Sequence, residues 1–209
     1  MTIVEPFERH SVEYDRWFAE NRLAYRSELA ALRSFIPIHG RGIELGVGSG
    51  RFAAPLGIGI GVDPSAKMRD MAKSRGLEVC GGVAEAVPFR DASFDCALMV
   101  TTLCFLDDLA AAFREAHRIT RAAGILVLGL IDKDSPLGES YRHGREKSTF
   151  YATATFRSVG EIVSQLKDAG FSSFSFVQTI FRDPEQIDDL EPVKAGYGEG
   201  LFVAVRAAK

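Results

Sequence analysis

The feature that most constrains this chain is a glycine-rich segment followed at fixed spacing by an acid. Residues 43–50 read IELGVGSG, and Asp63 ends the apolar stretch 59–63, nineteen residues after Glu44. The pattern predicts a short strand, a glycine turn, a short helix, and a second strand that ends in the acid. Glycines let the backbone approach a ligand closely and permit φ > 0 in the turn. A carboxylate at the tip of the second strand can accept hydrogen bonds from both ribose hydroxyls. The arrangement therefore predicts a site for a nucleoside-containing cofactor.

The spacing of the glycines distinguishes two kinds of nucleotide site. The nicotinamide pattern G-x-G-x-x-G needs a third glycine where the helix packs on the strand. Counting from Gly46, that position holds Arg51, and the chain instead shows E-x-G-x-G-x-G, which includes Glu44. A nucleotide-dependent oxidoreductase is therefore the less favoured alternative.

Further motifs follow in order along the chain. Residues 83–89 read VAEAVPF, residues 91–95 read DASFD, and residues 117–126 read HRITRAAGIL. With the glycine segment, they resemble the motifs of class I S-adenosylmethionine (SAM)-dependent methyltransferases across residues 40–130. The resemblance is to methyltransferase type 11, the subgroup that includes ubiquinone and menaquinone biosynthesis enzymes. It implies SAM as the cofactor and methyl transfer as the activity.

The order of predicted elements indicates the fold class. Strands and helices alternate with short connections, which predicts a doubly wound, Rossmann-like α/β sheet, mostly parallel, with helices on both faces. The strands are expected at 42–45, 58–62, 77–80, 94–100 and 125–131, and helices at 51–56, 65–75, 109–120 and 158–169. Segments 171–181 and 201–206 form the final pair, and the resemblance implies that the last strand is antiparallel. Ser65, Asp107 or Asp108, and Ser158 are the expected N-caps. We expect a single domain over residues 1–209.

The glycine motif and its neighbours supply the predicted cofactor site. The amides of the glycine turn suit the carboxylate of SAM. Glu44 accepts from the ammonium group of SAM or orients the turn, and Asp63 binds the ribose, caps the following helix, or does both. By the resemblance, Pro64 and Met68 flank the adenine. The predicted cofactor-binding residues are Glu44, Gly46, Gly48, Gly50, Asp63, Pro64, Met68, Ala84, Glu85 and Thr101.

The adenine end of the site departs from the family pattern. Val83 stands where the family usually has the aspartate that accepts from the adenine amino group. Either Glu85 accepts from the adenine amino group instead, or the amino group donates to backbone or water. The amides of Ala84 and Glu85 are available to read the adenine edge, and Thr101 is expected at the methionine part of the pocket.

Two segments outside the cofactor motifs are expected to cover the acceptor. Residues 1–36 are predicted as a helical lid, with one helical pattern over 7–35, and residues 132–157 as an irregular substrate cap broken at Pro136, Gly138 and Gly144. The predicted pocket walls are aromatic: Tyr14, Trp17, Phe18, Tyr141, Phe150 and Tyr151. Aromatic rings with nearby acids suit a small amine, and they also suit a phenol or a ring-bearing acid.

Methyl transfer from a sulfonium needs alignment more than acid–base chemistry. No catalytic base is assigned, and His143 is a weak candidate. The Asn/Asp-Pro-Pro-aromatic loop of amino-directed nucleic-acid enzymes is absent after the strand 94–100. We also expect no metal. The predicted reaction is in-line transfer to N, O or C of a small molecule, with S-adenosylhomocysteine as product. The alternative is a non-catalytic module that binds SAM or S-adenosylhomocysteine.

Composition limits the partners. The net charge is −3 and basic residues are scattered, so a nucleic-acid partner is not expected. No apolar run approaches the ~18–20 residues that span a bilayer, and no export signal is visible, so no membrane association is expected. Three cysteines in apolar contexts indicate free thiols in the cytoplasm. The sequence leaves open whether a homodimer forms through the last strand or the aromatic N-terminal helix.

Overall fold

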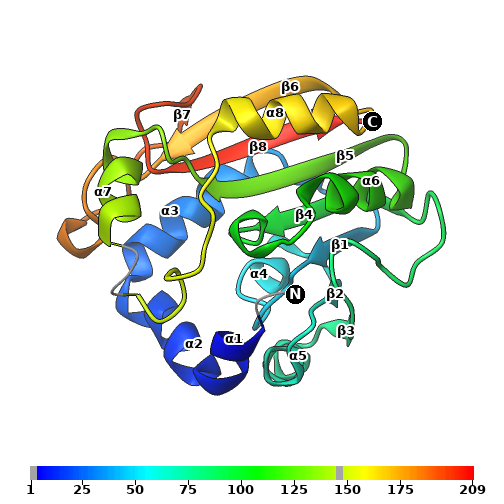
Figure 1. The fold of residues 1–209 in the computed structure, drawn as a ribbon, viewed down its shortest axis with the longest axis horizontal. Coiled ribbons are helices and arrows are strands. Elements are labelled where there is room, and N and C mark those ends of the chain that lie inside the picture. Colours follow the sequence, from blue (N-terminus) through cyan, green and yellow to red (C-terminus); the bar gives the residue numbers. More distant parts are fainter. Residues whose placement is uncertain (1–3, 145–147) are drawn as a thin grey trace.

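The centre of the molecule is one eight-stranded sheet (Figure 1). The computed structural model describes residues 4–144 and 148–209. The strand order is β3-β2-β1-β4-β5-β8-β6-β7. The strands are β1 (Gly42–Leu45), β2 (Ile60–Val62), β3 (Glu78–Cys80), β4 (Phe94–Val100), β5 (Thr120–Ile131), β6 (Ser172–Thr179), β7 (Lys194–Ala195) and β8 (Phe202–Ala208).

The first five strands run parallel, and β8 enters the sheet antiparallel between β5 and β6. The predicted doubly wound fold with a late antiparallel strand is therefore confirmed. Central strands are buried on both faces, as parallel strands require; six of the seven residues of β4 are buried. The two-residue strand β7, which the sequence did not predict, pairs with the edge of β6.

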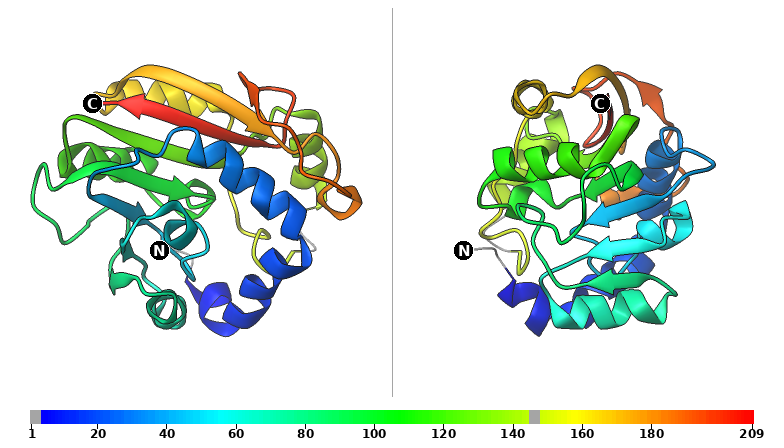
Figure 2. Two further views of the ribbon diagram at one scale, coloured as in Figure 1. Left: turned by 180° about the vertical axis from the view of Figure 1, so that it is seen from behind. Right: turned by 90° about the vertical axis from the view of Figure 1, so that its right-hand side faces the viewer.

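Helices cover both faces of the sheet and create two hydrophobic cores (Figure 2). On one face lie α6 (Leu109–Ile119) and α8 (Val159–Asp168). On the other lie α3 (Arg22–Arg33), α4 (Ala53–Leu56) and α5 (Ala66–Ser74). The apolar side of each helix packs on the sheet, so the carboxyl ends of the parallel strands are held in fixed register.

The predicted helix starts are confirmed by their caps. The Ser65 hydroxyl accepts from the Met68 amide at 3.1 Å, and the Asp108 carboxylate accepts from the Ala111 amide at 2.9 Å. Ser158 forms a reciprocal capping box with Glu161. Such side chains satisfy backbone N–H groups that the first helical turn leaves without partners.

The N-terminal segment is broken more sharply than its hydrophobic pattern predicts. It forms α1 (Glu5–Arg9), α2 (Ser11–Glu20) and α3, with turns at His10 and Asn21. The Trp17 carbonyl accepts from the Asn21 backbone amide at 2.8 Å and from the Asn21 side-chain amide at 3.1 Å, which holds the end of α2. These turns bring α1 and α2 across the carboxyl end of the sheet.

The segment 132–157 also differs from the prediction. Pro136 and Gly138 do not break the chain; they belong to helix α7 (Pro136–Gly144). Proline suits the first helical position, because its missing N–H would have no partner there. Gly138 is required by close packing, since a Cβ at this position would collide with the Asp132 carbonyl.

Candidate functional site

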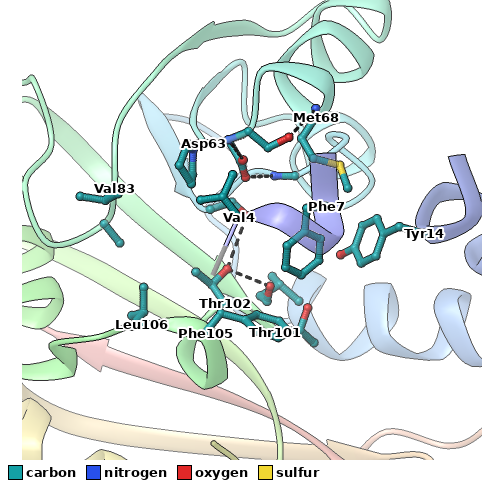
Figure 3. A pocket seen from close by; sticks show the side chains of 16 residues that line it. Val4, Phe7, Tyr14, Asp63, Met68, Val83, Thr101, Thr102, Phe105 and Leu106 are labelled. Carbon is teal, nitrogen blue, oxygen red and sulfur yellow. Dashed lines mark hydrogen bonds between the residues drawn. The ribbon is translucent and has the colours of Figure 1, made fainter. Parts of the chain in front are cut away.

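A cavity of about 620 Å³, including its open mouth, lies at the carboxyl ends of the central strands (Figure 3). Figure 3 shows Asp63 and Met68 on one side, Thr101, Thr102 and Phe105 on the opposite side, and the rings of Phe7 and Tyr14 beside them. The lining residues are Val4, Phe7, Tyr14, Gly46, Gly48, Asp63, Pro64, Ser65, Met68, Val83, Ala84, Val100, Thr101, Thr102, Phe105 and Leu106. A cavity here matches the rule that open α/β sheets bind ligands beyond the carboxyl ends of their strands.

The glycine turn forms the floor of the cavity, and each glycine has a different reason to be there. All three have positive φ, which glycine adopts without strain. A Cβ on Gly46 would collide with the Thr102 side chain. A Cβ on Gly50 would lie 2.6 Å from Leu77, so Gly50 serves helix packing and does not line the cavity. Gly48 faces the cavity, with the Tyr14 ring about 3.8 Å from a Cβ built there.

Asp63 sits at the tip of β2 with 8% of its surface exposed. Its carboxylate accepts from the Gly48 amide at 2.8 Å and from the Ser65 amide at 2.9 Å. Burial raises its pKa, against the opposing effect of these hydrogen bonds and of Arg69. The Asp63 carboxylate therefore ties the glycine turn to the start of α5 while it faces the cavity.

Glu44 is the most deeply buried acid of the motif, with 1% of its surface exposed. One carboxylate oxygen, Oε2, has no hydrogen-bond partner. Burial raises the pKa of Glu44 well above its usual range, the Ala53 amide opposes that shift, and Asp63 adds to it. Glu44 does not line the cavity directly, but its partnerless oxygen is a strong reason for a donor to be present nearby.

At the opposite end the cavity is apolar, with Val83, Ala84 and Leu106 in its wall. Glu85 is not among the lining residues; its Oε1 accepts from the Asp107 amide at 3.1 Å, and its buried Oε2 has no hydrogen-bond partner. Glu85 therefore supports the loop before α6, and Val83 leaves this wall without a carboxylate.

Thr101 lies where β4 ends, and its backbone adopts φ 51°. A β-branched residue rarely occupies this region, and such residues concentrate at functional sites. The Thr101 amide donates to the Gly129 carbonyl at 2.8 Å, and its side chain hydrogen-bonds Tyr14. Thr101 also borders a second, largely apolar cavity of about 290 Å³, which Cys104 and Phe156 help to line.

Rings from four segments meet at the mouth of the main cavity. Phe7 lies 5.5 Å from Tyr14, 5.0 Å from Phe105 and 5.6 Å from Phe150, measured between ring centroids. Tyr151 stacks on Phe105 at 5.8 Å. We call Phe7, Tyr14, Phe105, Phe150 and Tyr151 the aromatic cluster. It joins α1, α2, the turn after β4 and the segment before α8 around one space.

The comparisons with known proteins agree on one family. A model of the methyltransferase domain matches residues 43–128. A solved SAM-dependent methyltransferase of Thermotoga maritima, described as a possible histamine N-methyltransferase, is 50% identical; the match covers 98% of this chain and 99% of that one, with a TM-score of 0.95. An uncharacterized protein of Methanocaldococcus jannaschii is 44% identical over 97% of this chain and 98% of its own length. A demethylmenaquinone methyltransferase of Roseiflexus castenholzii is 37% identical over 42% of this chain and 41% of its own length.

The chain belongs to the class I SAM-dependent methyltransferases. SAM is accordingly its cofactor, and the residues present fit that molecule. One end of the cavity is apolar, as a nucleobase requires, and the buried Glu44 oxygen lacks a donor of the kind that an ammonium group supplies. Of the ten residues predicted for cofactor binding, seven line the cavity, namely Gly46, Gly48, Asp63, Pro64, Met68, Ala84 and Thr101.

The residues predicted to wall the acceptor pocket of this methyltransferase differ in where the structure places them. Tyr14 lines the cavity, and Phe150 and Tyr151 join it through the aromatic cluster. Phe18 is 5% exposed and packs in the core against Phe52, and Trp17 packs on Phe18. Tyr141 and His143 belong to α7, but their side chains lie outside the part that the structure describes.

Other residues at the site were not predicted. Phe7, Phe105 and Thr102 line the cavity, and only the doublet Thr101-Thr102 directly after a strand offered a local signal. Glu28, on α3, lies close enough to Tyr14 and Tyr25 to raise the pKa of both phenols. Burial raises the pKa of Glu28 itself to about 8.

Among residues 4–144 and 148–209, no group of three or more His, Cys, Asp or Glu side chains could hold a metal ion. Within the same residues, no helix has both the length and the apolar character that crossing a membrane requires.

Proposed function

We propose that this enzyme transfers the methyl group of SAM to the nitrogen of a small amine. The observation that carries the proposal is the aromatic cluster, whose Tyr14 phenol lies among three acids: Glu28, Glu44 and Asp63. Ring faces and carboxylates both attract a cation. The description of the Thermotoga relative as a possible histamine N-methyltransferase supports the same acceptor class.

For the cofactor, we propose these roles. Asp63 accepts from the ribose hydroxyls, and Pro64, Met68 and Ala84 enclose the adenine. Glu44 and the glycine turn contact the amino-acid end, and Thr101 lies at the methionine part. The Gly46 and Gly48 amides do not bind the SAM carboxylate as the sequence predicted, because they donate to the Val62 carbonyl and the Asp63 carboxylate. Bound SAM supplies an electrophilic methyl group. The protein must hold the acceptor nitrogen in line with it and keep water away.

An ammonium group has no lone pair, so an amine acceptor must lose a proton before attack. Glu28 is our candidate for the group that favours this loss. Its pKa of about 8 makes it a suitable proton acceptor close to that pH. Its carboxyl is not part of the cavity wall but lies beside Tyr14, which is. The Tyr14 phenol itself is an unsuitable base, because burial and the neighbouring acids raise its pKa.

The arrangement of the chain is also a proposal. We propose a single domain in which residues 1–36 act as a lid and residues 132–157 cap the acceptor. Cys80, Cys96 and Cys104 are free thiols, which supports a cytoplasmic enzyme. Solution measurements of mass will decide whether it forms a homodimer.

The test is a mass-spectrometric methylation assay with SAM and acceptors matched in ring and chain length: ethylamine derivatives of imidazole and benzene, and the corresponding phenols and carboxylic acids. We expect N-methylated product from the amines, with a rate that rises as the pH approaches 8. Product only from phenols or acids would overturn the nitrogen assignment. Binding of S-adenosylhomocysteine without turnover of any acceptor would favour the non-catalytic module.

A further inference from the structure

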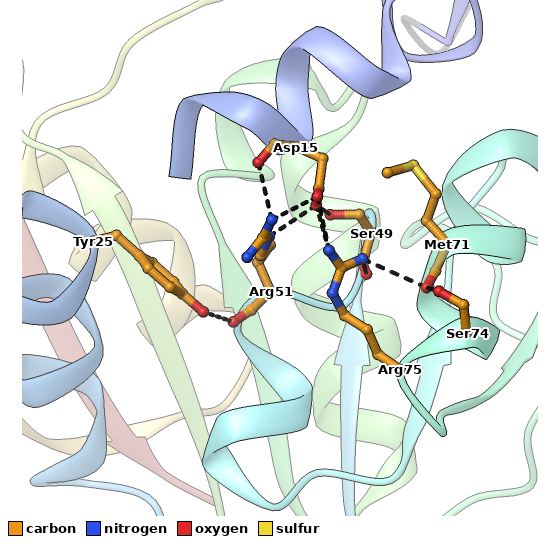
Figure 4. Close-up of polar contacts among 7 residues, drawn as sticks. All are labelled: Asp15, Tyr25, Ser49, Arg51, Met71, Ser74 and Arg75. Carbon is orange, nitrogen blue, oxygen red and sulfur yellow. Dashed lines mark hydrogen bonds and ion pairs between the residues drawn. The ribbon is translucent and has the colours of Figure 1, made fainter. Parts of the chain in front are cut away.

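Asp15, on the side of α2 that faces the body of the enzyme, is clamped by two arginines (Figure 4). Arg51 donates through Nε at 2.8 Å and through Nη2 at 2.6 Å, one bond to each carboxylate oxygen. Arg75 Nη2 donates to the same two oxygens at 2.8 and 2.7 Å. The Ser49 hydroxyl adds a bond of 2.7 Å. A single carboxylate thus receives five hydrogen bonds from three residues.

Both arginines are fixed to the cofactor-binding elements. Arg51 directly follows the glycine turn, and its carbonyl accepts from the Tyr25 hydroxyl of α3. Arg75 caps the end of α5 and also donates to the Ser49 carbonyl at 2.7 Å. The clamp therefore joins α2 to the glycine turn and to the C-terminal end of α5.

A second tie joins α1 to the same helix. The Glu8 carboxylate accepts from the Ala66 amide and, at 3.4 Å, from the Lys67 amide, so it neutralises the N-terminus of α5. Phe7 is the chain neighbour of Glu8, Tyr14 is the chain neighbour of Asp15, and both rings line the cavity. The lid is consequently attached beside α5 by hydrogen bonds, and its aromatic residues line the cavity.

We infer that Asp15 is a positioning residue: through Arg51 and Arg75 it holds Tyr14 and Phe7 in the cavity wall, and the cofactor enters and leaves when this clamp opens. The inference rests on the proposed lid, whereas the clamp itself belongs to the ligand-free fold. Arg51 stands where the nicotinamide pattern has its third glycine, and in this inference it anchors the lid.

The low exposure of the three charged side chains favours a strong interaction between the lid and the body of the enzyme. The Asp15 side chain is 14% exposed, and those of Arg51 and Arg75 are each 25% exposed. The nearby arginines and Ser49 lower the pKa of Asp15 despite its burial. Hydrogen bonds to charged, half-buried groups are stronger than exposed ion pairs. Removing the charge should therefore raise the rate of lid opening about 10- to 100-fold.

The first measurement needs no cofactor. Trp17, the chain's single tryptophan, lies two residues from Asp15, so acrylamide quenching of its fluorescence and hydrogen exchange of peptide 11–20 both report the lid. We compare Asp15→Asn with Glu13→Gln. Glu13 is on the same helix, is 58% exposed and pairs only with His10 among the described residues. Asp15→Asn should accelerate exchange of peptide 11–20 at least tenfold, and Glu13→Gln should match the wild type. Equal protection in all three proteins would overturn the clamp.

The second measurement links the clamp to the cofactor. Stopped-flow Trp17 fluorescence with S-adenosylhomocysteine gives the dissociation rate, which should rise about 10- to 100-fold in Asp15→Asn and not in Glu13→Gln. An unchanged rate with a loosened lid would overturn the gating role. Arg51→Gln removes the clamp from the body side and should reproduce the effect, so a folding defect of one variant cannot imitate it. If no protein binds S-adenosylhomocysteine, the proposed cofactor roles fail, and the ligand-free exchange still decides the clamp.

Discussion

At the scale of single residues, the site combines acids with very different surroundings. Asp15 is held ionised by two arginines, whereas Glu28, Glu44 and Asp63 lie where burial raises the pKa. Glu28, whose pKa burial raises to about 8, is therefore neutral through much of the ordinary pH range. A cation that binds near Glu28 favours loss of that proton, so binding is coupled to pH.

Glu28→Gln tests this coupling. Below about pH 4.5, Glu28 is protonated in both the folded and unfolded chain, so it does not affect the free energy of unfolding. As the pH rises toward 8, the unfolded chain ionises first, and the wild type loses stability that the neutral glutamine keeps. We expect the variant's advantage to be roughly 1–3 kcal/mol larger at pH 8 than at pH 5.

Urea unfolding at the two pH values measures this difference. Glu13→Gln, an exposed neutralisation in α2, is the control and should show no such trend. An equal effect of Glu28→Gln at both pH values would mean that its carboxyl is solvated.

Gly48→Val tests the floor of the cavity. A valine here must adopt φ 52° and project toward Tyr14, so it should abolish detectable S-adenosylhomocysteine binding in calorimetry. Gly57→Val is the matched control, since Gly57 has φ 77° and open space around its Cβ position. It shares the backbone strain without the steric block and should bind normally. Normal binding by Gly48→Val would remove the turn from the cofactor site.

At the scale of elements, the proposed lid contains two helices, α1 and α2, that contribute differently to the site and to the core. Helix α1 has no buried residue, and it supplies Phe7 and Glu8 to the site. Helix α2 places Phe18 in the core beside Phe52. Deleting α1 therefore removes part of the acceptor wall, whereas a deletion that extends through α2 also opens the core.

A variant that lacks residues 1–9 should fold and lose acceptor turnover. We expect kcat/KM for the best acceptor to fall at least tenfold, because Phe7 contacts Tyr14, Phe105 and Phe150. Far-UV circular dichroism and the unfolding midpoint check the fold. Full turnover in the truncated enzyme would contradict a lid role for α1.

The elements also show which parts of this structure a sequence can reveal. The strands, the glycine turn and the caps at Ser65, Asp108 and Ser158 follow from local patterns, because strand burial and capping depend on neighbouring residues. The bend at Asn21 does not, because the hydrophobic spacing continues through a residue whose backbone leaves the helical conformation at φ −103° and ψ 46°. Pro136 misled the prediction because proline breaks a helix interior and favours a helix start.

At the scale of the whole molecule, the site is assembled from contacts between distant segments. Asp15 meets Arg51 and Arg75, which lie 36 and 60 positions away along the chain. Nothing in local periodicity pairs these residues, and the same holds for Phe7 and Phe150. The motifs could therefore predict the proposed cofactor side of the site and three rings of the aromatic cluster, whereas the contacts that join those rings to Phe7 and Phe105 emerge only from the folded chain.

Because the proposed site draws on distant segments, the stabilisation of the whole fold by a ligand tests whether that ligand binds there. A ligand that binds only the native state stabilises it by RT ln(1 + [L]/Kd), about 2.7 kcal/mol at a concentration of 100 Kd. S-adenosylhomocysteine contacts the sheet ends, α5 and the lid in our proposal. It should therefore raise the unfolding temperature and slow hydrogen exchange in peptide 11–20 together. NAD⁺, whose glycine pattern is broken at Arg51, should do neither.

In Asp15→Asn, the temperature shift should shrink because part of the binding energy is used to hold the lid closed. A full shift in that variant would mean that cofactor binding does not depend on lid closure.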